Sequence, residues 1–77
     1  VYNRNRKEDR MDPKRIGKTL TKLREDRGES QKDVADAIGV TVMAVRNYEN
    51  GDRIPNDENK IKLAEHFRKP VTIFFTA

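Results

Sequence analysis

The chain has 77 residues, of which 34% are hydrophobic and 39% are charged, so it has room for one small domain with a thin core. It contains no cysteine, which excludes a disulfide framework and a thiolate metal site, and a two-domain enzyme does not fit this length. The formal net charge of +4 favours a polyanionic partner such as nucleic acid.

The start of the chain, residues 1–11, is predicted to be a flexible basic arm. Six of its first ten residues are charged, and the apolar side chains there are too few to offset the entropy of ordering. The remainder, 12–77, is expected to form one domain. No apolar run approaches the roughly 18 residues of a membrane span, so we expect a cytoplasmic protein without membrane attachment.

A first helix is predicted from Pro13 to a glycine C-cap at Gly28. Asp12 is a favourable N-cap, and proline suits the first helical position because an N–H there would have no helical partner. The apolar residues that follow recur at helical spacing and indicate one buried stripe. They are Ile16, Leu20 and Leu23.

Two shorter helices follow. Ser30 with Asp33 matches a capping box at the start of the second helix, and Gly39 ends it. Thr41 is expected to cap the third helix, which closes at Asn50-Gly51. The residues expected to fill the interior between them are Val34, Ala35, Ile38, Val40, Val45 and Tyr48.

A fourth helix is predicted from Asn56, because Pro55 disfavours helix before it and two acidic residues suit a first helical turn. Its inward residues are expected to be Ile61, Ala64 and Phe67 or Leu63. The β-prone stretch after Pro70 would lack a partner strand, so a short fifth helix is expected there.

Two short helices joined at Gly39 must cross steeply, which requires a small residue such as Ala35 beneath the crossing. This geometry is typical of a helix-turn-helix, in which the second helix of the pair enters the DNA major groove. The outward face of the third helix is then the candidate base-reading surface. Its residues are Val42, Met43, Arg46 and Asn47.

The chain resembles the Cro/lambda-repressor-like (Xre) family over about residues 13–75. The likeness is carried by four motifs: S-Q-x-x-V-A-x-x-I-G-V-T at 30–41, Y-E-N-G at 48–51, I-P-N at 54–56 and L-A-x-x-F at 63–67. The resemblance implies an all-α, compact five-helix DNA-binding domain with its helix-turn-helix at the second and third helices.

The resemblance also implies residue roles. Gln31 matches a glutamine that grips a DNA phosphate, although it could be only a good first-turn residue. Arg24 and Glu49 match an ion pair beneath the DNA-facing surface. The other implied backbone contacts are Thr41, Asn50 and Arg53.

The departure from the family lies at Val42 and Met43, which cannot make the bidentate hydrogen bonds that discriminate bases. They can pack on thymine methyl groups, and Met43 could instead face a partner. Direct readout then falls to Asn47, suited to adenine, and to Arg46, suited to guanine or a phosphate. Part of the selectivity is therefore expected to come from dimer spacing and DNA deformability.

The predicted function is a sequence-specific double-stranded DNA-binding transcriptional regulator, a repressor of phage, mobile-element or bacterial origin. It is expected to bind an inverted-repeat operator as a homodimer formed through the C-terminal end, at Phe74 and Phe75. No enzyme activity, cofactor or metal is expected, and the lone His66 is placed at the surface or the core edge. The alternatives are an adaptor or antitoxin built on the same fold, and nonspecific nucleic-acid binding.

Overall fold

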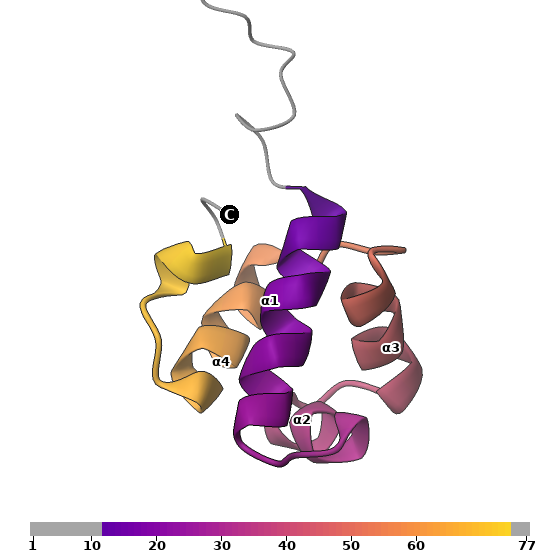
Figure 1. The fold of residues 1–77 in the computed structure, drawn as a ribbon, viewed down its shortest axis with the longest axis vertical. Helices are drawn as coiled ribbons and strands as arrows, with labels where there is room; N and C mark the ends of the chain where they lie inside the picture. Colours follow the sequence, from indigo (N-terminus) through magenta and orange to yellow (C-terminus); the bar gives the residue numbers. More distant parts are fainter. Residues whose placement is uncertain (1–11, 75–77) are drawn as a thin grey trace, which may run out of the picture.

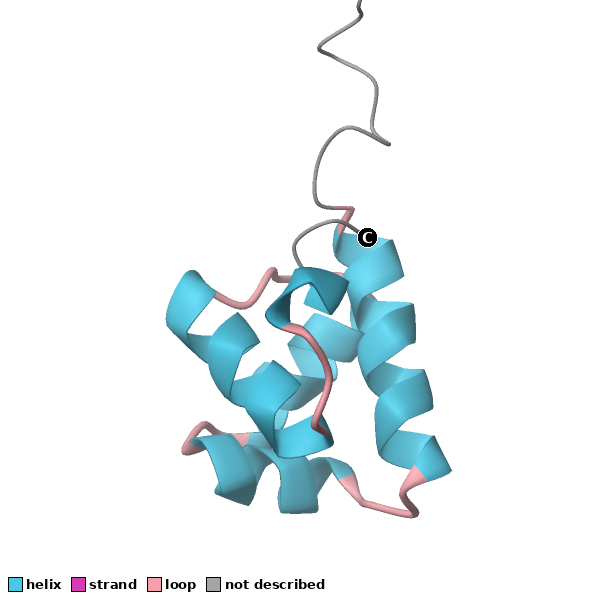
Figure 2. Cartoon of the chain, turned by 90° about the vertical axis from the view of Figure 1, so that its left-hand side faces the viewer, coloured by secondary structure: helices cyan, strands magenta, loops and turns pink. Residues whose placement is uncertain are grey.

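A computed structural model of the chain describes residues 12–74, and within them the chain is all-helical. In Figure 1, α1 runs through the middle of the molecule between α3 and α4, and α2 lies across one end; Figure 2 shows the same domain from the side of α4. The elements are α1 (Pro13–Asp26), α2 (Gln31–Ile38), α3 (Val42–Asn50), α4 (Asp57–Phe67) and a 3-10 helix, η2 (Val71–Phe74).

Each of the four α-helices begins at a polar side chain that accepts a backbone N–H of the first turn. The four N-caps are Asp12, Ser30, Thr41 and Asn56. At α2 the capping box is complete, since Asp33 N donates to Ser30 Oγ at 3.0 Å and Ser30 N donates to the Asp33 carboxylate at 2.9 Å. The predicted helix starts are confirmed, with α4 beginning one residue later than expected.

The turn between α2 and α3 depends on a left-handed glycine. Gly39 has φ 76°, a conformation that other L-residues rarely adopt, and its N–H and that of Val40 both donate to Ala35 O, at 2.9 and 3.0 Å. The chain can therefore turn within three residues and begin α3 at Val42, with Thr41 as its N-cap.

The core is a single cluster shared by all four α-helices and η2. Its members are Ile16, Leu20, Val34, Ala35, Ile38, Val45, Tyr48, Leu63, Ala64, Phe67 and Phe74, with Leu23 and Val40 partly buried against it. Gly17 is an unforeseen part of this packing: a Cβ there would lie 2.6 Å from Tyr48 O. The missing side chain is what lets α1 approach the backbone of α3.

Two details of the sequence prediction are wrong, and the expected short fifth helix is present in a 3-10 form. Ile61 is 44% exposed, because α4 turns Lys60, Leu63, Ala64 and Phe67 inward and Ile61 lies about 100° round the helix from Lys60. The fifth helix is a single 3-10 turn that starts after Pro70. The first helix ends at Asp26 with Arg27 as its C-cap, and Gly28 follows in the left-handed region with φ 67°.

The predicted dimer contact at Phe74 is also corrected. Phe74 is completely buried in its own core, where it joins η2 to α4, so it has no surface to offer to a partner. Phe75 and the arm predicted for residues 1–11 lie outside the described residues. Within 12–74, no helix combines the length and the apolar content needed to cross a membrane.

Candidate nucleic-acid interface

The outer face of α3 is free of the rest of the described fold. Val45 and Tyr48 point into the core, so the residues on the other side of the helix point away from it. Met43 is 55% exposed and Val42 is 37% exposed, while Arg46 is exposed and Asn47 is half-buried. The four residues predicted to read bases therefore share one accessible ridge.

The two ends of this ridge carry the other polar residues. At the start of α3, Thr41 Oγ1 accepts the N–H of Ala44 at 3.0 Å, which leaves the hydroxyl hydrogen available to another acceptor. At its end, Asn50 is exposed, and the following loop is held to the helix because Arg53 N donates to Asn47 O at 3.3 Å. Thr41, Asn50 and Arg53 thus border the ridge.

Beneath the ridge, α3 is tied to α1 by a bidentate ion pair. Arg24 donates to the Glu49 carboxylate through Nε at 2.6 Å and through Nη2 at 3.1 Å. The Glu49 side chain is 5% exposed and that of Arg24 is 16% exposed. The hydrogen bond to Glu49 raises the pKa of Arg24 against the opposing effect of burial, so both charges are held in one geometry.

The same carboxylate also holds Gln31 at the start of α2. Gln31 Nε2 donates to Glu49 Oε1 at 2.9 Å, so one buried carboxylate orients side chains from two other helices. An amide nitrogen carries two hydrogens, and this bond uses one of them. The sequence motif places Gln31 at the helix start but does not reveal this partner.

A second polar cluster joins the segment between α1 and α2 to the end of α4. His66 Nε2 lies 2.7 Å from Glu29 Oε1, and Arg27 Nε lies 3.1 Å from the other oxygen of that carboxylate. His66 is half-buried, as predicted, and is bound within the fold. Among residues 12–74, no group of three potential ligand side chains is placed to hold a metal ion.

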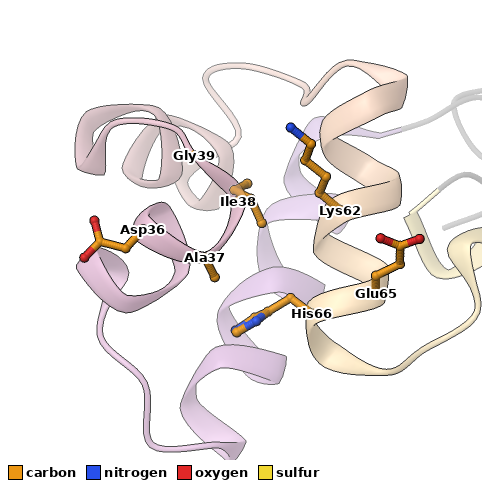
Figure 3. A pocket seen from close by; sticks show the side chains of 7 residues that line it. All are labelled: Asp36, Ala37, Ile38, Gly39, Lys62, Glu65 and His66. Carbon is orange, nitrogen blue, oxygen red and sulfur yellow. The ribbon is translucent and has the colours of Figure 1, made fainter.

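An open groove runs between α2 and α4 beside this cluster (Figure 3). Figure 3 shows Asp36, Lys62, Glu65 and His66 spread around its rim rather than directed at one point. A general acid, a base and a nucleophile would have to converge on one reacting atom. The groove lacks that convergence, so the ridge on α3 is the better candidate site.

Comparison with known proteins identifies the family. The helix-turn-helix family model HTH_3 matches residues 20–74. The chain is 31% identical over 51 residues to the cryptic phage CTXphi transcriptional repressor RstR of Vibrio cholerae serotype O1, a match that covers 66% of this chain and 46% of that repressor. The chain thus spans less than half the length of that relative.

Two solved structures have the same fold. The restriction-modification controller protein C.AhdI from Aeromonas hydrophila superposes with a TM-score of 0.77 at 30% identity, over 83% of this chain and 97% of that one. An HTH_3 family transcriptional regulator from Vibrio cholerae gives 0.74 at 26% identity, over 83% of this chain and 36% of that one. Since the family match covers more than half of the sequence, the protein belongs to the helix-turn-helix family of the Cro and lambda-repressor type.

Proposed function

We propose that the protein is a sequence-specific regulator of transcription that binds duplex DNA as a homodimer, with α3 in the major groove. The observation that carries the proposal is the ridge on α3, which is exposed while its base is fixed to α1 and α2 through Glu49. A ridge that is both accessible and rigid suits the insertion of a helix into a groove of fixed width.

Base readout in this proposal is divided between polar and apolar contacts. Asn47 can pair with adenine N6 and N7, and Arg46 can pair with guanine O6 and N7 or a phosphate; a good bidentate pair discriminates by about 1–3 kcal/mol. The exposed Val42 and Met43 can pack only on thymine methyl groups or sugars. Selectivity beyond two base pairs per half-site then depends on dimer spacing and DNA deformability.

Backbone contacts are proposed around the ridge. The second amide hydrogen of Gln31, the free hydroxyl hydrogen of Thr41, and the side chains of Asn50 and Arg53 can all donate to phosphate oxygens. The N-terminus of α2 adds the partial positive charge of its unpaired amides. These contacts would set the register of α3 without reading sequence.

The dimer is proposed because a two-fold operator doubles the short half-site. Half-sites would lie about 34 Å apart, one helical turn of DNA. Since Phe74 is buried, we assign the contact to the exposed apolar residues of the same end, Ile61 on α4 and Val71 on η2, which are 44% and 37% exposed. Repression is proposed from the likeness to a phage repressor, and regulation by occupying a promoter requires only binding.

The test is a selection of bound sequences from random duplexes at two salt concentrations, followed by sequencing. We expect enrichment of an inverted repeat. Asn47→Ala should relax the preference at one position of each half-site, whereas Glu65→Gln, an exposed change on α4, should leave the motif unaltered. Binding without enrichment would overturn sequence specificity, and an absence of binding would favour a protein-docking role for the exposed Val42 and Met43.

A further inference from the structure

The positive charges of the described residues fall into two groups. Several cations are neutralised one helical turn away: Lys22 pairs with Asp26 at 3.5 Å, Lys32 with Asp36 at 2.7 Å and Lys62 with Glu58 at 3.1 Å. Within residues 12–74, no carboxylate pairs with the side chains of three cations in the first half of α1. These are Lys14, Arg15 and Lys18.

This basic stretch does not stabilise its own helix. The partial positive charge of a helix N-terminus repels nearby cations and attracts acids, and α4 follows that rule with Asp57 and Glu58 in its first turn. The first turn of α1 contains no acidic residue and instead carries Lys14 and Arg15. Because helix stability does not account for these charges, a negatively charged partner is the better explanation.

Packing places Lys14 at the edge of the proposed DNA surface. Gly17 faces the carbonyls of Tyr48 and Glu49, and a Cβ at Gly51 would lie 3.0 Å from Lys14 Cγ, so α1 crosses the end of α3. Figure 1 shows the start of α1 near the loop that follows α3. Lys14 therefore lies against Gly51, which stands between Asn50 and Arg53 in the chain.

The positions of the cations around α1 distinguish Lys14 and Lys18 from Arg15 and Lys22. Gly17 faces α3, and Lys14 and Lys18 lie about 60° and 100° round the helix from it. Lys22 and Arg15 lie about 140° and 160° from Gly17, so they point further from α3. All four side chains are exposed, and the two pairs carry the same formal charge but differ in direction, with Lys22 also paired to Asp26.

We propose that Lys14 and Lys18 form a second line of phosphate contacts, on the backbone that flanks the stretch bound by Asn50 and Arg53. The proposal rests on the proposed function, since it takes duplex DNA as the partner of the ridge. Lysine suits this role because its long stem delivers a point charge to phosphates in several geometries. The contact would add affinity without adding sequence information.

The test compares two double variants of equal net charge. Lys14→Gln with Lys18→Gln removes both proposed contacts, and Arg15→Gln with Lys22→Gln removes two charges from the other flank. Binding of the selected duplex is measured by fluorescence anisotropy between 50 and 200 mM salt. Each lost phosphate contact should reduce the slope of log affinity against log salt by about 0.9, so the first variant should lose nearly two units and the second far less.

The possible outcomes test the lysine contacts and the proposed DNA-binding function separately. If the unaltered protein binds duplex DNA and both variants have the same slope, the second line of contacts is overturned while the regulator assignment stands. If the unaltered protein binds no duplex, both proposals fall. Thermal unfolding provides a further check, because the loss of Lys14 from a helix N-terminus should not lower the midpoint.

Discussion

The two long sides of this domain expose different kinds of residues, although they share one core. On the side of α3, the exposed residues are a mixed apolar and polar ridge bordered by cations without a carboxylate partner among the described residues. On the side of α4 and η2, Ile61 and Val71 are exposed, and the neighbouring Lys62 is neutralised by Glu58. In the function proposed above, the first surface faces DNA and the second faces the partner subunit.

The most severe test of this contrast removes the carboxylate beneath the ridge. Glu49→Ala should leave Arg24 without its partner and Gln31 without its anchor, destabilising the fold by about 3 kcal/mol in urea unfolding. Glu25→Ala removes the distant, exposed partner of the same arginine, 4.0 Å away, and should cost less than about 0.5 kcal/mol. Equal effects of the two changes would show that the buried pair does not fix α3.

A second test presses α1 away from α3. Gly17→Ala places a methyl group against the carbonyls of Tyr48 and Glu49 and should destabilise by about 2 kcal/mol, with a larger loss of DNA affinity than of helix content. Lys18→Ala, next to it but exposed, is the control for helix propensity and should not destabilise the fold. Unfolding curves of equal midpoint would contradict the close approach.

A charged substitution on α4 tests the surface proposed for the dimer. Ile61→Asp should weaken self-association at least about tenfold, equivalent to about 1.4 kcal/mol, because it buries a carboxylate in the proposed dimer contact. Its 44% exposure predicts little change in monomer stability. Sedimentation equilibrium measures the effect, with Glu65→Gln on the same helix as the control; an unchanged dimer constant would move the interface elsewhere.

The smallest expected effect concerns the start of α2. Hydrogen bonds from Ser30 hold the pKa of Asp33 below its ordinary value of 3.8, so its stabilisation is present above that value and lost as the pH falls through the lowered pKa. Asp33→Asn should therefore flatten the pH dependence of unfolding below about pH 4. Asp36→Asn, in the same helix but outside the capping box, should retain the steeper dependence of the native chain.

Sequence patterns predicted the parts of this fold that depend on local chemistry. The caps at Ser30 and Thr41 follow from side chains that bind the nearby backbone, and the turn at Gly39 follows from the left-handed conformation that glycine allows. The face that α4 turns inward did not follow, because its inward row includes Lys60, whose whole side chain is buried while apolar Ile61 is exposed. Hydrophobicity alone assigns these two neighbours to the wrong faces.

The position of the candidate site could be predicted from the sequence, but the contacts that join it to the other helices could not. The periodicity of α3 places the outward residues on one face, since Val45 and Tyr48 identify the inward one. The bond from Gln31 to Glu49 joins residues 18 positions apart, and the role of Gly17 depends on a neighbour in another helix. Such contacts arise from tertiary packing, and no local spacing encodes them.

The alternation along α3 has a consequence for how such a protein could acquire new targets. Its inward side chains, Val45 and Tyr48, pack in the core, while Val42, Met43 and Arg46 are exposed. Exchanging the outer set for that of a relative should redirect the protein to a foreign operator without refolding it. Within the nine residues of α3, one set of side chains would then determine the DNA target and another set the packing of the helix.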